Sequence, residues 1–237
     1  MDDDQSRSIP YQVINSQAHH AQAISDCIKR AHGVDVGDVL ACCPEPGQVL
    51  EQITRHPKGH FVAIAEIGGE EVVLGCAVTM RTNYSPHHKP LSFLDMIGSV
   101  EIERHNPQGE WLYGVDFAVL PEYQGNGIGS TLYKARFQYI RRTGLKGMYA
   151  CGMLKGYDRY RYEYTQQDYG KKVISGEIQD PTVSMQMRNG FEPRKVVESY
   201  DVDYLAGNAA VLIVWEARKQ RSHKLADGTR QRIRLSL

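Results

Sequence analysis

The spacing of apolar residues along this chain predicts strands and helices in alternation. Dense runs of β-branched and aromatic residues predict strands, and apolar residues three or four positions apart predict helices. The predicted strands are Tyr11–Asn15, His60–Ile67, Val72–Thr82, Trp111–Leu120, Met148–Cys151, Phe191–Asp203 and Ala209–Ala217. The predicted helices cover 16–33, 45–55, 128–144, 165–175 and 181–189.

These elements follow the order β-α-α-β-β-β-α-β-α-β-β, which predicts an α/β fold: an α+β mixed sheet with helices on both faces. Gly68-Gly69 predicts a hairpin between two of the strands. Two stretches, about 83–110 and 155–180, are expected to be long insertions. We therefore expect a polar N-terminal tail over 1–10, one domain over 11–217 and a basic C-terminal tail over 218–237.

For two of the predicted helices we expect particular side-chain contacts. Ser16 is expected to cap the first helix, because a hydroxyl there can accept from the free N–H groups of the first turn. In the second helix, Val49, Leu50 and Ile53 are expected to face inward, because they share one face at helical spacing.

Charge is balanced overall but unevenly distributed. The chain has 28 basic and 28 acidic residues and a hydrophobic share of 41%. From Arg218 onward there are seven Lys/Arg and one acid, so the tail carries +6 and the rest −6. A solvated tail, or one lying on the acidic body, is the simpler interpretation. Contact with a polyanion is the alternative.

Cysteine use and the start of the chain favour a cytoplasmic protein. The five cysteines are odd in number and form no C-x-x-C pair, which is typical of reduced thiols. The acidic start, Met1-Asp2-Asp3-Asp4, does not resemble a secretory signal. No apolar run approaches the roughly 18 residues of a membrane span, so no membrane partner is expected.

A glycine-rich turn between a strand and a helix indicates a phosphate site. The segment Gln124-Gly125-Asn126-Gly127-Ile128-Gly129-Ser130 follows the strand ending at Leu120. Free N–H groups and the helix dipole favour an anion at such a turn. The P-loop lysine is missing, because Gly129 is followed by Ser130-Thr131. The dinucleotide pattern G-x-G-x-x-G also fails at its third glycine.

The remaining pattern, Q-x-x-G-x-G after Val-x-Pro, resembles the acyl-CoA pyrophosphate loop of the GNAT N-acetyltransferases. The segments 151–157, 176–182 and 186–191 resemble more closely the acetyltransferase domains found beside nitrilase-like hydrolases. The resemblance implies a GNAT acyl-CoA N-acyltransferase fold with long insertions, acetyl-CoA as cosubstrate and no metal. It also implies direct transfer of the acetyl group to an amine in a ternary complex.

The resemblance assigns binding roles to the strand and the loop. In GNAT folds this strand splays from its neighbour, and the acyl arm lies in the gap. Backbone groups of Phe117, Ala118 and Val119 would bind the arm and the thioester carbonyl. The N–H groups of the loop would bind the pyrophosphate. The loop residues concerned are Gln124, Gly125, Asn126, Gly127, Ile128, Gly129 and Ser130.

The group that takes the amine's proton is open between several residues. Asp116 could act directly or through water, or be a carboxylate paired with a cation. Tyr113 is a second candidate, with a core position as its alternative. Glu101 and Glu103 could recognise a cationic substrate or lie in a solvated loop. Cys151 could carry a covalent acyl group, although a small strand residue is the simpler interpretation.

One departure from the family keeps a second function open. Many GNAT enzymes have a tyrosine four residues before the glycine of their Gly-Phe pair, and this chain has Gln186 there. An amide has no proton to give at neutral pH. The alternative function is therefore a non-catalytic acyl-CoA-binding regulatory module. Whether the chain forms a homodimer is open.

Two further ligand classes are not expected from the sequence. His19-His20 and His87-His88 are not expected to bind a metal, because neighbouring side chains on one element should point apart. The tyrosine-rich stretch 157–164 could stack on bases. Rims of small-molecule sites use the same residue types, so nucleic acid is not the expected partner.

Overall fold

The computed structural model describes residues 9–33 and 43–217, which divide into two compact units. Unit 1 draws on Met1–Met80, Leu94–Pro107 and Gly114–Arg136, as far as these are described. Unit 2 consists of the described residues within Arg81–Phe93, Gln108–Tyr113 and Phe137–Leu237. The basic tail 218–237, Cys42 and most of the acidic N-terminal tail lie outside the described residues.

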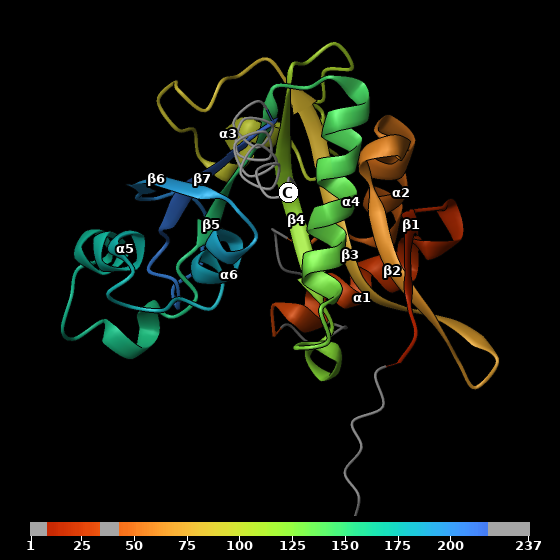
Figure 1. Cartoon of the computed structure of the whole chain (residues 1–237), viewed down its shortest axis with the longest axis horizontal. Helices are drawn as coiled ribbons and strands as arrows, with labels where there is room; N and C mark the ends of the chain where they lie inside the picture. Colours follow the sequence, from red (N-terminus) through yellow and green to blue (C-terminus); the bar gives the residue numbers. More distant parts are fainter. Residues whose placement is uncertain (1–8, 34–42, 218–237) are drawn as a thin grey trace, which may run out of the picture. The chain divides into compact units, whose positions relative to one another are not determined.

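The structure confirms the mixed sheet with its helices (Figure 1). The strands are β1 (Gln12–Asn15), β2 (Phe61–Ile67), β3 (Glu70–Thr82), β4 (Trp111–Val119), β5 (Gly147–Met153), β6 (Glu192–Val197) and β7 (Ala210–Glu216). Their order in the sheet is β1-β2-β3-β4-β5-β7-β6. The helices are α1 (Ala21–Ala31), α2 (Pro46–Arg55), α3 (Phe93–Ile97), α4 (Ile128–Thr143), α5 (Gln166–Ser175) and α6 (Val183–Arg188).

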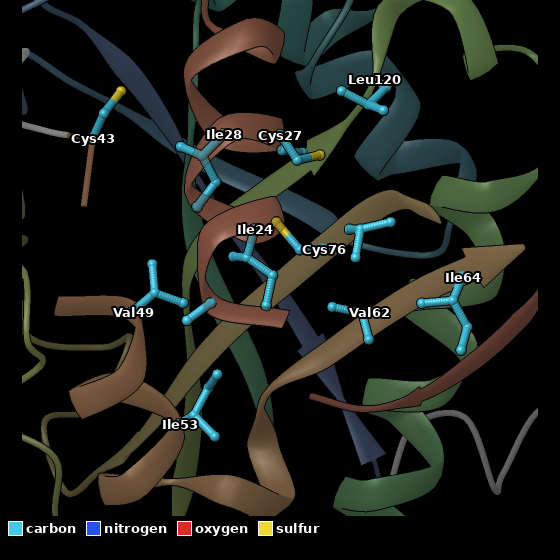
Figure 2. Packing of buried hydrophobic residues seen from close by; sticks show 13 residues of the cluster. Ile24, Cys27, Ile28, Cys43, Val49, Ile53, Val62, Ile64, Cys76 and Leu120 are labelled. Atoms are coloured by element: carbon cyan, nitrogen blue, oxygen red, sulfur yellow. The ribbon is translucent and has the colours of Figure 1, made fainter. Parts of the chain in front are cut away.

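In unit 1 a hairpin and two amphipathic helices enclose an apolar core. Gly68 and Gly69 have φ of +64° and +84°, so they supply the left-handed turn that joins β2 to β3. Figure 2 shows side chains of α1 and α2 directed toward those of β2 and β3. The labelled residues of this cluster are Ile24, Cys27, Ile28, Cys43, Val49, Ile53, Val62, Ile64, Cys76 and Leu120.

Two packing expectations in unit 1 were wrong. Ser16 does not cap a helix; its hydroxyl lies 2.8 Å from Nδ1 of His60. A 3-10 turn, Ala18–His20, precedes α1 and takes the position expected for the helix start. Leu50 is 43% exposed, whereas Val49 and Ile53 are buried. The apolar spacing was right, but the stripe of α2 that meets the core is too narrow to include Leu50.

In unit 2, β7 lies between β5 and β6 and pairs antiparallel with both. β6 ends at Val197, so the predicted strand 191–203 was too long; 198–203 form a turn and irregular structure. Asp180 anchors the segment 155–180, which is expected to be an insertion. Its buried carboxylate accepts hydrogen bonds from the Gly156, Thr182 and Val183 N–H groups and from the Tyr169 hydroxyl.

The pairing of β4 with β5 is short. These parallel strands are in register at Trp111↔Gly147, Leu112↔Met148 and Tyr113↔Tyr149. Both strands continue beyond the last pair, β4 to Val119 and β5 to Met153. Among the described residues, no helix combines the length and the apolar character that a membrane span needs.

The buried imidazole of His60 leads to a prediction on stability. Its Nδ1 lies 2.8 Å from the Ser16 hydroxyl, and burial, followed by the charge of His20, lowers its pKa to about 3. In the unfolded chain this imidazole therefore binds a proton near pH 6.5, whereas in the folded chain it stays neutral at that pH. We expect the free energy of unfolding to fall by up to about 1.4 kcal/mol per pH unit below pH 6.5.

Urea unfolding between pH 7.5 and 4 measures this dependence. His60→Gln should be less stable at pH 7.5 but should lose less stability on acidification than the wild type. His87→Gln is the matched control, because His87 is exposed. Equal slopes for wild type and His60→Gln would contradict the assignment.

Candidate active site

The glycine loop of unit 1 joins β4 to α4 and is fixed by its own side chains. The Leu120 N–H donates to the Leu74 carbonyl at 2.9 Å, which holds the end of β4 against β3. The Gln124 amide donates to the Val119 carbonyl at 3.1 Å, and the Asn126 amide donates to the Tyr123 carbonyl at 3.1 Å. These two amides therefore shape the loop from within.

Two glycines set the loop's backbone. Gly125 and Gly127 have φ of +81° and +77°, which L side chains rarely adopt. The loop from Gln124 to Gly127 is exposed. The first N–H groups of α4, from Ile128 onward, have no partner within the helix itself. The arrangement offers backbone donors and the positive end of a 16-residue helix to an anion.

Gly129, unlike Gly125 and Gly127, is not in the left-handed region, and it lies beside the Phe117 ring. A Cβ at this position would lie 3.4 Å from the Phe117 ring. The Phe117 ring in turn stacks on Tyr133 of α4, with ring centroids 4.6 Å apart. Phe117 thus joins β4 to α4 through its side chain, and its backbone remains the part that could contact a ligand.

Tyr11 is a loop neighbour that the sequence analysis missed. Its hydroxyl lies 2.9 Å from Oγ1 of Thr131, in the first turn of α4. The same hydroxyl is the group that a Cβ on Gly127 would meet, at 3.7 Å. Tyr11 precedes the loop by more than 110 residues, so no local pattern could have linked the two.

Asp116 lies on β4 of unit 1 beside a histidine that the sequence did not single out. Its Oδ1 is 3.9 Å from Nε2 of His32, and its side chain is 12% exposed. His32 follows the last residue of α1, where a positive charge is favourable to the helix dipole. The separation is too long for a direct hydrogen bond and suits a bridging water. The Asp116 carboxylate and the His32 imidazole therefore face each other across a gap in a partly exposed position.

Tyr113, on the part of β4 that belongs to unit 2, is buried in an aromatic cluster. Its hydroxyl lies 2.5 Å from that of Tyr200, and its ring packs edge-on against Tyr149. Desolvation raises the pKa of Tyr113 well above its usual value, so the phenol keeps its proton. This geometry corresponds to the core interpretation of Tyr113.

Two other candidates in unit 2 have properties of packing residues. Burial raises the pKa of the Cys151 thiol to about 12, which leaves it without thiolate character at neutral pH. Gln186 of α6 is buried over Gly152 of β5, where a Cβ would lie 2.1 Å from its Oε1. Gly152 is therefore required to make room for the Gln186 amide.

The acidic candidates of the first insertion differ in their contacts. Glu101 accepts a hydrogen bond from the Gln48 amide at 2.7 Å. The nearby Ser99 side chain, and then the hydrogen bond from Gln48, lower the pKa of Glu101. Its carboxylate is thus engaged in holding the segment around Glu101 to α2. Glu103 is exposed.

The expectation that His19 and His20 point apart was wrong. Both Nε2 atoms approach Oε1 of Glu71, at 3.2 and 2.9 Å, because the 3-10 turn lets the two rings lie together over β3. These three groups offer ligand atoms within 4.8 Å of one another. Nδ1 of His20 accepts from the Gln17 N–H at 2.8 Å, so the ring hydrogen lies on Nε2 and faces Glu71. A metal there would have to displace that hydrogen.

Comparison with known proteins identifies the family. Residues 37–157, about half of the chain, match the Acetyltransferase (GNAT) family. The chain therefore belongs to the GNAT acetyltransferase family, as the glycine loop predicted. Membership supports acyl transfer as the general chemistry.

Two Bacillus subtilis (strain 168) proteins are similar in sequence. "Probable hydrolase YhcX" is 30% identical over 168 residues, which cover 70% of this chain and 32% of YhcX. The chain thus spans about a third of the length of that relative, in accord with the resemblance to domains found beside hydrolases. "Uncharacterized N-acetyltransferase YkwB" is 27% identical, covering 71% of this chain and 73% of YkwB.

A solved structure shows the same fold. The GphF GNAT-like decarboxylase, in complex with isobutyryl-CoA, has a TM-score of 0.70 at 16% identity. The match covers 87% of this chain and 99% of that one. The similarity establishes the fold and leaves the reaction of this chain to its own residues.

Proposed function

We propose that this chain is an acetyl-CoA-dependent N-acetyltransferase that transfers the acetyl group directly to an amine in a ternary complex. We also propose that 11–217 form one acetyltransferase domain with insertions at 83–110 and 155–180. The observation that carries the proposal is the glycine loop, whose left-handed Gly125 and Gly127 open α4 with free N–H groups. The acyl-CoA bound to the GphF structure supports the choice of cosubstrate.

The loop would hold the pyrophosphate, and β4 would hold the acyl arm. The N–H groups from Gly125 to Ser130 bind the phosphates, and the backbone of Phe117, Ala118 and Val119 binds the arm. Fixing both reactants on one protein replaces a chance encounter with an intramolecular step. A backbone donor from β4 to the thioester oxygen would stabilise the negative charge that develops there.

Asp116 is the group proposed to accept the amine's proton. The amine nitrogen attacks the thioester carbonyl carbon, a C–N bond forms and the C–S bond breaks. The proton passes to Asp116, directly or through the water suited to the space beside His32. Gln186 has no proton to donate, so the leaving thiolate takes one from solvent or from a tyrosine outside α6, with Tyr157 and Tyr160 as the candidates.

Acetyl-CoA turnover with a panel of amines tests the proposal. Thiol release should require both an amine and the intact loop. A polyamine, an amino sugar and a peptide with a free N-terminus cover the main classes of acceptor. Thermal protection by CoA without thiol release on any of them would favour the alternative, a non-catalytic acyl-CoA-binding module. Gln186, an amide where many relatives have a proton donor, is the observation that favours this second candidate.

A kinetic prediction separates direct transfer from a covalent route through Cys151. With a pKa of about 12, only about one thiol in 10⁵ is ionised at pH 7. Cys151→Ala should therefore keep kcat within about threefold of wild type, well short of a catalytic loss. Initial-rate plots against both substrates should intersect. Parallel lines, or an acetylated Cys151 trapped without acceptor, would exclude direct transfer.

A further inference from the structure

Unit 1 contains a buried cation that the proposed reaction does not use. Arg136 of α4 is 1% exposed and is among the largest fully buried side chains. Its guanidinium carbon lies 4.2 Å from the centre of the Tyr133 ring and 4.8 Å from that of Phe117. Each of the two rings makes a cation–π contact with the guanidinium.

The rings leave hydrogen-bond donors of Arg136 unused. Within residues 9–33 and 43–217, neither Nε nor Nη2 has a hydrogen-bond partner. These two donors lie on the same edge of the planar guanidinium. That edge can bind a carboxylate through two parallel hydrogen bonds. Buried donors without partners are strongly unfavourable, and more so when the group is charged.

The charge of Arg136 also lacks a counter-ion among the described residues. Burial lowers its pKa, while Tyr133 and Cys76 raise it, and neither of these is a carboxylate. The Cys76 thiol stays neutral, because its hydrogen bond with Cys27, and then burial, raise its pKa well above the usual value. An arginine stays protonated even when it is buried. A buried cation with an open two-donor edge is suited to binding an anion.

The position of Arg136 relates this edge to the proposed cofactor. Arg136 is eight residues beyond Ile128, or about 12 Å along the same helix from its phosphate-binding end. Phe117 spans part of the distance, because its ring contacts Arg136 and also lies against Gly129. Phosphates would bind at the exposed loop, whereas Arg136 lies two turns deeper. An anion that reaches it would belong to the acyl end of the ligand.

We propose that Arg136 binds a carboxylate at the end of the acyl group, so that the preferred cosubstrate is a dicarboxylic acyl-CoA rather than acetyl-CoA. The inference rests on the proposed function, since it assumes that the loop binds CoA. It replaces acetyl with a dicarboxylic acyl group as the group preferred for transfer, and it leaves the proposed roles of the loop and Asp116 unchanged.

Calorimetric binding of CoA, acetyl-CoA, malonyl-CoA and succinyl-CoA tests the inference. Wild type should bind one of the two dicarboxylic thioesters about ten to a hundred times more tightly than acetyl-CoA, the range for charged hydrogen bonds. Arg136→Met should abolish this preference and keep CoA affinity within about twofold. Arg136→Lys, which keeps the charge but loses the two-donor edge, should retain part of the preference. Arg141→Met is the matched control on α4 and should leave the preference unchanged.

Several outcomes would overturn the inference. One is equal affinity of wild type for acetyl-CoA and both dicarboxylic thioesters, a result that needs no variant to fold. Another is a preference that persists in Arg136→Met. A loss of affinity for CoA itself in Arg136→Met, equal to the loss for its thioesters, would assign the anion to a phosphate of the cofactor. Failure of wild type to bind CoA at all would instead contradict the proposed function.

Discussion

Gly127→Val is expected to weaken CoA binding about a hundredfold, the loss of roughly 3 kcal/mol in charged hydrogen bonds. Gly127 has φ of +77°, and valine is among the residues least able to adopt it. The new side chain would either move the backbone out of the left-handed region or fill the space through which a phosphate approaches. Both changes disrupt the N–H groups that the proposal assigns to the pyrophosphate.

The measurement is titration calorimetry with CoA, supported by thermal protection with CoA, NAD and ATP. CoA should protect wild type far more than NAD or ATP. Gly69→Val is the matched control: it lies in unit 1, has φ of +84° and has no heavy atom within 4 Å of an added Cβ. The control should show similar backbone strain and unchanged CoA affinity. Equal affinity in wild type and Gly127→Val would remove the loop from the CoA site.

Asp116→Asn is expected to lower kcat at pH 7 by about 10²- to 10⁴-fold, the usual contribution of a general base. The asparagine keeps the size of the side chain and cannot accept the amine's proton. Activity should recover partly at higher pH, because more of the amine is then already deprotonated. CoA affinity should stay within about twofold of wild type, since Asp116 is not assigned to cofactor binding.

His32 and Asp26 supply the comparisons. His32→Gln should lower kcat less than Asp116→Asn and should change the pH profile, because the proposal gives His32 an influence on the reaction through Asp116, 3.9 Å away. Asp26→Asn, on the outer part of α1, should leave kcat unchanged. Wild-type kcat in Asp116→Asn at every pH would exclude Asp116 as the base. An identical effect in Asp26→Asn would indicate a loss of fold rather than of chemistry.

The elements and the loop were predictable because their causes are local. Apolar spacing fixed which segments became helices or strands, and Gly68-Gly69 fixed the hairpin, since each depends on residues close together in the chain. The loop from Gln124 to Ser130 was recognised for the same reason, because a turn between a strand and a helix needs its glycines at set positions.

Local patterns gave wrong answers where packing decided the outcome. Ser16 looked like a helix cap, yet its hydroxyl bonds to His60, 44 residues away. His19 and His20 were expected to diverge, yet both rings meet Glu71 of β3. In each case the residue that binds the side chain comes from another element of the fold. Rules for helix capping and for side-chain alternation consider only neighbours in the sequence, so they cannot predict such a contact.

By itself, then, the sequence determined the order of the elements, the mixed sheet and the glycine loop. Only the tertiary structure brought His32 to Asp116, Tyr11 to Thr131 and Phe117 to Arg136. An arginine on a helix is expected to face water, and nothing in its sequence neighbours indicates that it is buried. The sheet and α4 place Arg136 beneath aromatic rings, because contacts between distant residues form only once the whole unit has folded.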